Sequence, residues 1–179
     1  MTWMIESTRD AAVAPADVFR LYANPSTWSE WGHNAKWARA DGPLVEGGTV
    51  DVKAGYGKVY PCHIRSLVDG RSLVLEARPP FMTVIQTYEV EPAAAGAHIR
   101  HALEISGPLA GITQLVRLDR VYQGWLDKEV GKLIKMAASP SGPTDARHSV
   151  TPTPMTMGSK GGSAHPIETL SDGQGRLGR

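Results

Sequence analysis

Residues 98–109 read HIRHALEISGPL, and residues 110–137 continue as AGITQLVRLDRVYQGWLDKEVGKLIKMA. Every second side chain of the first run belongs to a mainly apolar set, formed by Ile99, His101, Leu103 and Ile105. A period of two residues is typical of a strand with one face in the core. Gly107-Pro108 ends this strand, and only isolated glycines interrupt the helical pattern from Leu109 to about Ala137. The apolar face of that helix comprises Leu115, Leu118, Tyr122, Trp125, Leu126, Leu133 and Ile134. We therefore predict a closing strand followed by one long amphipathic helix.

The beginning of the chain predicts a strand and two short helices. The strand is indicated by an alternation of apolar or small residues with polar ones, namely Trp3, Ile5 and Ser7. Ala14-Pro15-Ala16-Asp17 is typical of a helix start, because proline fits the first turn and Asp17 faces the positive end of the helix dipole. Asn24-Pro25 ends this helix, and Trp28 and Trp31 then share one side of a second short helix.

The middle of the chain predicts a meander of short strands. Candidate strands cover residues 49–53, 57–67, 72–78, 82–91 and 98–106. Tight turn signals such as Asp69-Gly70 and Pro79-Pro80 separate them, which favours antiparallel pairing. One helix has too little area to cover such a sheet tightly, so the sheet must curl around it. We expect this curl to leave a cavity between the helix and the concave face of the sheet.

This order of elements resembles the helix-grip fold of the START-like (SRPBCC) superfamily, and within it the polyketide cyclase/dehydrase-like proteins. The resemblance covers residues 3–137 and rests on the order and spacing of several short segments. These are Ala14-Pro15-Ala16-Asp17-Val18-Phe19, Asn24-Pro25 with Trp28 and Trp31, Tyr88-Glu-Val-Glu-Pro92, Gly107-Pro108-Leu109-Ala110 and the long final helix. It implies an α+β fold in which a curved antiparallel sheet wraps one long C-terminal helix. It also implies an apolar ligand such as a lipid or a polyketide, and in some members cyclisation or dehydration. No catalytic residue is carried over, because no invariant catalytic motif defines the group.

Composition limits the function and the compartment. The formal net charge is +1, which does not favour a nucleic-acid groove. No apolar run approaches the length of a membrane-spanning helix, and the first residues lack the pattern of a secretory signal. Cys62 is the single cysteine, so neither an intramolecular disulfide nor a cysteine-based zinc site can form. We expect a cytoplasmic protein without a cofactor.

The aromatic residues divide the chain into two parts. All five Trp, all five Tyr and both Phe precede Ala138, whereas the remainder is rich in Pro, Gly and Ser. Such a segment cannot bury enough apolar surface to offset the entropy of ordering it. We predict a ligand-binding domain over residues 1–138 and a disordered tail over residues 139–179.

Strand periodicity predicts which polar side chains point into the cavity. If the more apolar faces lie inward, three strands place Tyr60, Gln86, Tyr88 and His101 inside, although a bulge would reverse a face. Tyr122 on the final helix is a further candidate. Trp37, together with His33, lies in a segment that we predict to be a loop able to cover the cavity. The predicted ligand-binding residues are therefore Trp37, Tyr60, Gln86, Tyr88, His101 and Tyr122.

His101 has two interpretations. It could bind a ligand carbonyl or move a proton, which makes it the one weak catalytic candidate. Alternatively it could hydrogen-bond Tyr88, Gln86 or Tyr122 without meeting a substrate. His98 and His101 lie on opposite faces of one strand, so they cannot share an ion, and we predict no metal site.

Three functions remain open at this point. The leading hypothesis is a protein that binds an apolar or aromatic small molecule of polyketide- or lipid-like type. The second is a cyclase or dehydratase that acts on a poly-carbonyl substrate in the same cavity. The third is an interaction module with a filled interior. The sequence does not specify the ligand, the choice between binding and catalysis, the oligomeric state or the role of the tail.

Overall fold

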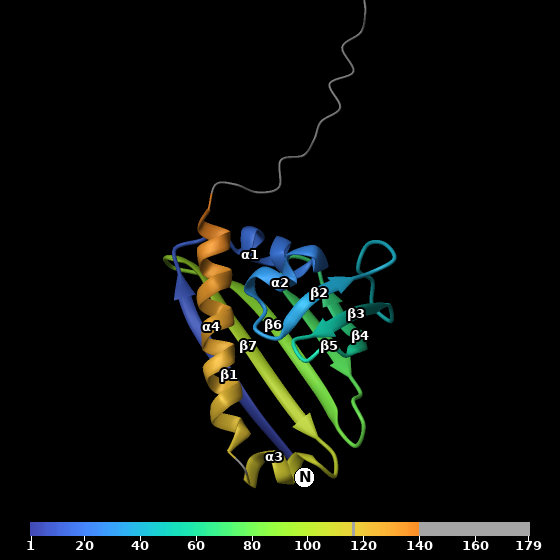
Figure 1. Cartoon of the computed structure of the whole chain (residues 1–179). Coiled ribbons are helices and arrows are strands. Elements are labelled where there is room, and N and C mark those ends of the chain that lie inside the picture. Colours follow the sequence, from blue (N-terminus) through green and yellow to red (C-terminus); the bar gives the residue numbers. More distant parts are fainter. Residues whose placement is uncertain (116, 140–179) are drawn as a thin grey trace, which may run out of the picture. The chain divides into compact units, whose positions relative to one another are not determined.

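A seven-stranded antiparallel sheet dominates the computed structural model, which describes residues 1–115 and 117–139 (Figure 1). The strand order is β1-β7-β6-β5-β4-β3-β2. The strands are β1 (Thr2–Ala11), β2 (Ala35–Arg39), β3 (Thr49–Ala54), β4 (Val59–Val68), β5 (Ser72–Ala77), β6 (Thr83–Ala93) and β7 (Gly96–Ser106). Strands β2 to β7 are neighbours in the order in which they occur in the chain, and β3 to β7 form the predicted meander.

Pairing of β1 with β7 joins the first strand of the chain to the last. The register runs from Thr2 opposite Ser106 to Ala11 opposite Ala97. This closure places the N-terminal strand beside the end of the meander, where no tight turn connects the two. Because the pairing is continuous over the whole of β1, this strand widens the sheet along the full length of β7.

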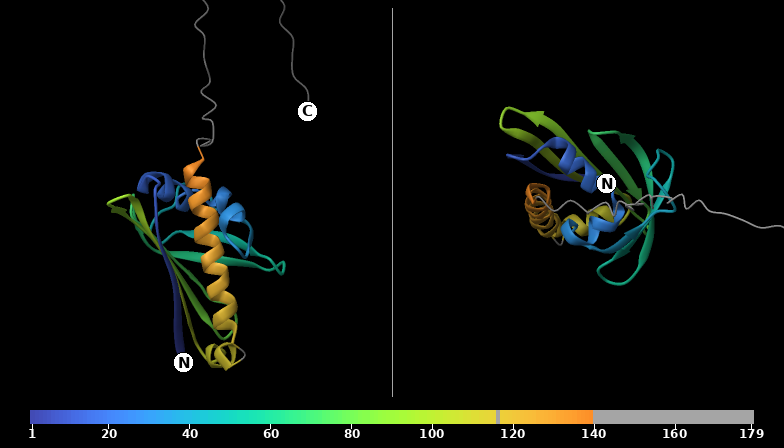
Figure 2. Two further views of the ribbon diagram at one scale, coloured as in Figure 1. Left: turned by 90° about the vertical axis from the view of Figure 1, so that its left-hand side faces the viewer. Right: turned by 90° about the horizontal axis from the view of Figure 1, so that it is seen from above.

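Helices cover the concave face of the sheet. They are α1 (Pro15–Tyr22), the 3-10 helix η1 (Pro25–Thr27), α2 (Trp28–Trp31), α3 (Ala110–Leu115) and α4 (Leu118–Ala138). Figure 2 shows the long helix α4 inside the curve of the sheet, and α4 contacts β1, β7, α1 and α2. Val130 and Leu133 on α4 are completely buried in the main core cluster. The predicted helix-grip architecture is thus the fold of the protein.

Two local predictions differ from the structure. The segment predicted as a covering loop contains strand β2, which pairs with β3 at the edge of the sheet and includes Trp37. Its residues, Ala35-Lys36-Trp37-Ala38-Arg39, do not alternate strictly between apolar and polar, and its register shifts between Ala35 and Trp37. The final helix is divided, because Arg117 adopts a left-handed backbone conformation (φ 56°) between α3 and α4. The long helix therefore begins at Leu118 and not at Leu109.

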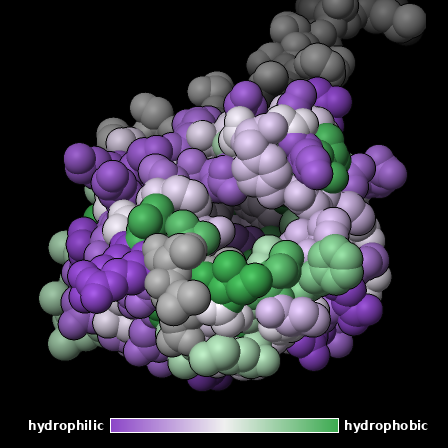
Figure 3. All heavy atoms as spheres, turned by 60° about the horizontal axis from the view of Figure 1, so that its bottom comes forward, coloured by the Kyte–Doolittle hydropathy of each residue, from purple (hydrophilic) through white to green (hydrophobic). Residues whose placement is uncertain are grey.

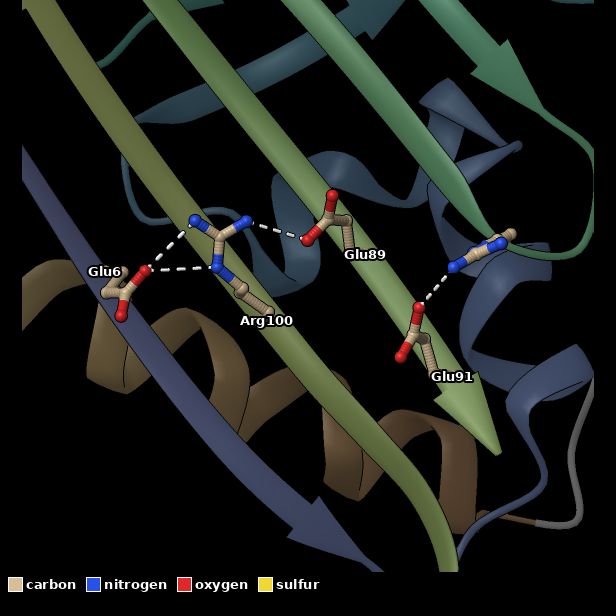
Figure 4. A network of polar contacts seen from close by, with 5 residues as sticks. Glu6, Glu89, Glu91 and Arg100 are labelled. Atoms are coloured by element: carbon tan, nitrogen blue, oxygen red, sulfur yellow. Dashed lines mark hydrogen bonds and ion pairs between the residues drawn. The ribbon is translucent and has the colours of Figure 1, made fainter. Parts of the chain in front are cut away.

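An ion-pair network joins three strands on the face opposite His101 (Figure 4). The Arg100 guanidinium on β7 donates to Glu89 on β6 (2.7 Å) and to Glu6 on β1 (3.0 Å). Glu91 on β6 accepts from Arg71 at 2.6 Å. The hydrogen bond to Glu89 is the main reason that the pKa of Arg100 is raised. Since neighbouring residues of a strand point to opposite faces, this polar ladder keeps the His101 side of β7 turned inward.

None of the helices in the described residues has the length and apolar character needed to cross a membrane. The predicted tail of residues 139–179 lies, except for Ser139, outside the described residues, and so does the side chain of Leu115.

Candidate functional site

A cavity of about 330 Å³ lies between the concave face of the sheet and the helices α2 and α4. Strands β3 to β7 contribute its floor, and the turn after β3 and the segment before β6 contribute part of its rim. Figure 3 shows a hollow with apolar side chains along part of its edge.

Aromatic side chains form much of the cavity wall. They are Trp28, Trp31, Tyr56, Tyr60, Tyr88, Tyr122 and Trp125. Several rings support one another at their edges, as in the pair Trp31–Tyr88 (centroids 5.5 Å apart) and the pair Tyr122–Trp125 (4.9 Å). Such edge-to-face contacts are favourable for aromatic rings, so the wall is held in place by its own packing.

One carboxylate lies in this largely apolar wall. Glu129 on α4 is a lining residue, and 11% of its side-chain surface is exposed to solvent. Its Oε1 atom accepts a hydrogen bond from the backbone N–H of His33 at 2.7 Å. The His33 ring in turn stacks on Trp125, one turn earlier on α4, with centroids 4.7 Å apart. The segment after α2 therefore fixes the orientation of the Glu129 carboxylate.

His101 lies directly behind the wall. It is completely buried, and its Nε2 atom is 3.0 Å from the Tyr22 hydroxyl oxygen. Its Nδ1 atom has no hydrogen-bond partner among the described residues, and it lies 3.8 Å from Glu129 Oε2. The Tyr22 hydroxyl can donate to Nε2 or accept from it, so this contact fits either tautomer of the ring.

The buried tyrosines around His101 are held in their neutral form. Burial is the largest cause that raises the pKa of Tyr22 and of Tyr88, and the negative charge of Glu129 is the second. Cys62 on β4 also lines the cavity, and burial followed by the charge of Asp51 raises the pKa of its thiol to about 11. None of these three groups carries a charge at neutral pH, so each offers only weak or neutral hydrogen-bonding atoms.

The structure distributes the six predicted binding residues between two environments. Tyr60, Gln86, Tyr88 and Tyr122 line the cavity. Trp37 and His101 do not line it. Trp37 belongs to the edge strand β2, where the Arg39 guanidinium lies 4.8 Å from its ring centroid. His101 is separated from the cavity by the rings of Trp31 and Tyr88, whose centroids lie 5.9 Å and 4.8 Å from its own.

Sequence reasoning missed Glu129. It lies four residues from Trp125 and four from Leu133, so it occupies the apolar face of the final helix. A single charged residue on an otherwise apolar helix face is the signal that could have identified it. Trp28 and Trp31, which the sequence placed on one side of a short helix, are both buried and also border the cavity.

In the described part of the chain, no group of three or more His, Cys, Asp or Glu side chains is arranged to hold a metal ion. His98 is exposed and hydrogen-bonds Asp10 on the outer face at 2.6 Å, whereas His101 points inward.

Residues 2–137 match the family model described as polyketide cyclase / dehydrase and lipid transport. The chain belongs to this family. No curated protein sequence matches the chain.

Solved structures share the fold of this polyketide cyclase/dehydrase and lipid transport family member at low sequence identity. Ginseng major latex-like protein 151 from Panax ginseng is 10% identical, with 78% of this chain and 99% of that protein covered and a TM-score of 0.62. The di-domain ARO/CYC StfQ from the steffimycin biosynthetic pathway is 12% identical, with 76% of this chain and 51% of StfQ covered and a TM-score of 0.61. Protein MLL2253 from Mesorhizobium loti is 18% identical, with 75% of this chain and 96% of MLL2253 covered and a TM-score of 0.55. At sequence identities this low, the structural similarity shows a common fold and nothing further.

Proposed function

We propose that this protein binds an apolar or aromatic small molecule, of polyketide- or lipid-like type, in the cavity between the sheet and α4. The observation that carries the proposal is the cavity itself, which is lined mainly by aromatic and aliphatic side chains and contains a few polar groups, among them Gln86 and Glu129. Small-molecule sites in proteins usually combine these features. The family description, which names both cyclases and lipid transport, supports the same class of ligand.

Burial of ligand surface supplies most of the affinity in this proposal, at roughly 25 cal/mol per Å² of apolar surface. Tyr60, Gln86, Tyr88 and Tyr122 provide the polar atoms and ring edges that orient the ligand. Trp37 and His101 are not in the proposed contact set. His101 acts from behind, because its ring packs on Tyr88 and restricts the positions that the tyrosine can take.

The proposal is tested by native mass spectrometry of gently purified protein, with a cavity-filling variant as comparison. Ala77 lines the cavity at the end of β5, so Ala77→Phe should displace any apolar compound that co-purifies with the wild type. Val74 lies on the other face of β5, and Val74→Phe is the matched control that should retain the compound. A wild-type protein that carries no compound and takes up no apolar probe would contradict the proposal.

Ring closure of a poly-carbonyl chain is a second candidate function, favoured by the Glu129 carboxylate at the cavity wall with His101 behind it. In this reaction the carboxylate would take a proton from the carbon between two carbonyls. The resulting carbanion would attack a further carbonyl carbon to form the new C–C bond, and the protonated Glu129 carboxyl would return its proton to the alkoxide. Loss of this hydroxyl together with a hydrogen of the neighbouring carbon would then release water. Holding the chain folded in the cavity would supply much of the rate.

The two candidates are separated by a comparison of binding with turnover. Glu129→Gln keeps the hydrogen bond from His33, because the amide oxygen can accept it, and removes the base. In a cyclase this variant would bind a poly-carbonyl compound and fail to convert it. A binding protein would leave the same compound unchanged in both the wild type and the variant.

A further inference from the structure

We infer that the ligand of this cavity carries a positively charged nitrogen, held beside Glu129 and against the aromatic wall. This inference rests on the proposed binding function and adds the chemical class of the polar end of the ligand.

The charge balance of the cavity is the first reason. Among the described residues that line it there is one carboxylate, from Glu129, and there is no lysine, no arginine and no histidine. Lys128 and Lys132 on α4 are exposed, so their ammonium groups lie away from the cavity. Burial raises the pKa of Tyr88, Tyr122 and Cys62, which leaves these lining groups neutral near pH 7. The lining of this cavity thus includes, among the described residues, one acidic side chain and no basic one.

The hydrogen bonding of Glu129 is the second reason. An ionised carboxylate can accept about four hydrogen bonds. Oε1 accepts one from the backbone of His33, and the separation of 3.8 Å between Oε2 and His101 Nδ1 is too long for another. Within the described part of the chain, Glu129 therefore accepts one hydrogen bond, from a backbone group, and His101 Nδ1 is the nearest basic atom behind it. Because a buried charge is costly unless it is paired, a cationic ligand group is the partner that this wall lacks.

The arrangement of the rings is the third reason. Trp125 lies one helical turn before Glu129 on α4, and the Tyr122 ring packs edge-on against the Trp125 ring. Trp31 and Tyr88 border the cavity beside His101, whose ring faces Glu129. Aromatic faces attract ammonium groups, most strongly when water is excluded. A cation beside Glu129 would therefore meet a carboxylate and indole or phenol rings together, whereas a carboxylate ligand would meet a like charge.

The experiment uses three probes with the same apolar cage and different head groups: adamantylmethylamine, adamantylmethanol and adamantane carboxylate. Binding to the full chain is followed at about pH 7.5, where the amine is charged, through the fluorescence of the cavity tryptophans. We expect the amine to bind about tenfold more tightly than the alcohol, and the carboxylate to bind most weakly. Glu129→Gln should reduce the difference between amine and alcohol to within about twofold while the alcohol still binds, which also shows that the variant is folded.

Two further variants complete the experiment: one should increase the preference for the amine, and the other is a control that should leave binding unchanged. Gln86→Glu adds a second carboxylate to the same cavity and should increase the preference for the amine. Glu76→Gln removes a carboxylate from the opposite face of β5 and should leave all three affinities unchanged.

Each other result has a distinct meaning. Equal binding of amine and alcohol, unaffected by Glu129→Gln, would overturn the inference and leave the binding function in place. Tightest binding of the carboxylate would also overturn it, because His101 would then be acting as a cation. Failure of all three probes to bind would contradict the binding function and the inference with it.

Discussion

Tyr22 and His101 are both completely buried, and one hydrogen bond of 3.0 Å joins them across the main core cluster. Tyr22→Phe removes the hydroxyl and leaves His101 Nε2 without this partner in an apolar interior. We expect the free energy of unfolding to fall by about 1–3 kcal/mol, measured by urea denaturation. Tyr122→Phe removes the same atom from a partly exposed side chain and should cost less than about 0.5 kcal/mol. An equal loss of unfolding free energy in both variants would show that the buried hydrogen bond contributes no more to stability than the Tyr122 hydroxyl does.

Cys62 reports on the cavity because it is the single cysteine and lines the wall. Only the thiolate reacts with iodoacetamide, and the pKa of this thiol is about 11 because of burial and the charge of Asp51. The alkylation rate should therefore keep rising with pH up to about 11, beyond the range in which the unfolded protein, with an ordinary thiol pKa of about 8.5, levels off. Adamantylmethylamine in the cavity should slow the reaction. A rate in the folded protein that levels off near pH 8.5 would contradict the buried environment.

At the scale of elements, Glu76 links β5 to its neighbour β4. It accepts a hydrogen bond from Arg78 and lies 3.3 Å from Arg65 on β4, although it is nearly buried itself. The hydrogen bond from Arg78 is the largest influence, and with the nearby positive charges it holds the pKa of Glu76 below its ordinary value of 4.5. A carboxyl with a lowered pKa in the folded state stabilises the fold above its ordinary pKa. This stabilisation is lost as the pH falls through the pKa that Glu76 has in the folded protein.

We therefore expect Glu76→Gln to lower the free energy of unfolding by about 1 kcal/mol near pH 7, since both arginines are largely exposed. The difference from the wild type should shrink as the pH falls below 4.5 and disappear in urea titrations in strong acid, where Glu76 is protonated in both the folded and the unfolded state. Glu91→Gln breaks a half-exposed pair with Arg71 and should have a smaller effect at either pH. A difference for Glu76→Gln that persists unchanged in acid would mean that charge is not its cause.

At the scale of the whole molecule, residues 1–138 remain our proposal for a self-sufficient domain. The family match ends at residue 137, and every aromatic residue of the chain precedes residue 138. A chain that ends at residue 139 should unfold at the same temperature as the full chain, within about 2 °C, and should bind the adamantyl probes equally well. A matched truncation after residue 128 removes half of α4, including Glu129 and Leu133, and should prevent folding. A clear loss of stability on removal of residues 140–179 would show that the domain extends further.

Local patterns in the sequence determined most of the fold. The alternation in β6 and β7 sorted their side chains by face, and Gln86 and Tyr88 indeed border the cavity. The bulge in β4 falls after Ile64, so it leaves the faces of Tyr60 and Cys62 as the alternation predicted. These assignments succeeded because strand and helix periods depend only on neighbouring residues. The left-handed residue Arg117, which divides the final helix, has no such periodic signal.

Contacts between distant residues decided the site. The Glu129 carboxylate is held by the backbone of His33, 96 residues earlier, and His101 is enclosed by Tyr22 from α1. The face of β7 was predictable, but the depth of His101 behind Trp31 and Tyr88 was not, because it depends on how α1 and α2 sit in the curve of the sheet. The sequence by itself determined the strands, the helices and the inward faces through their short periods. Only the tertiary structure decided which inward side chains reach the cavity, because that depends on the packing of elements far apart in the chain.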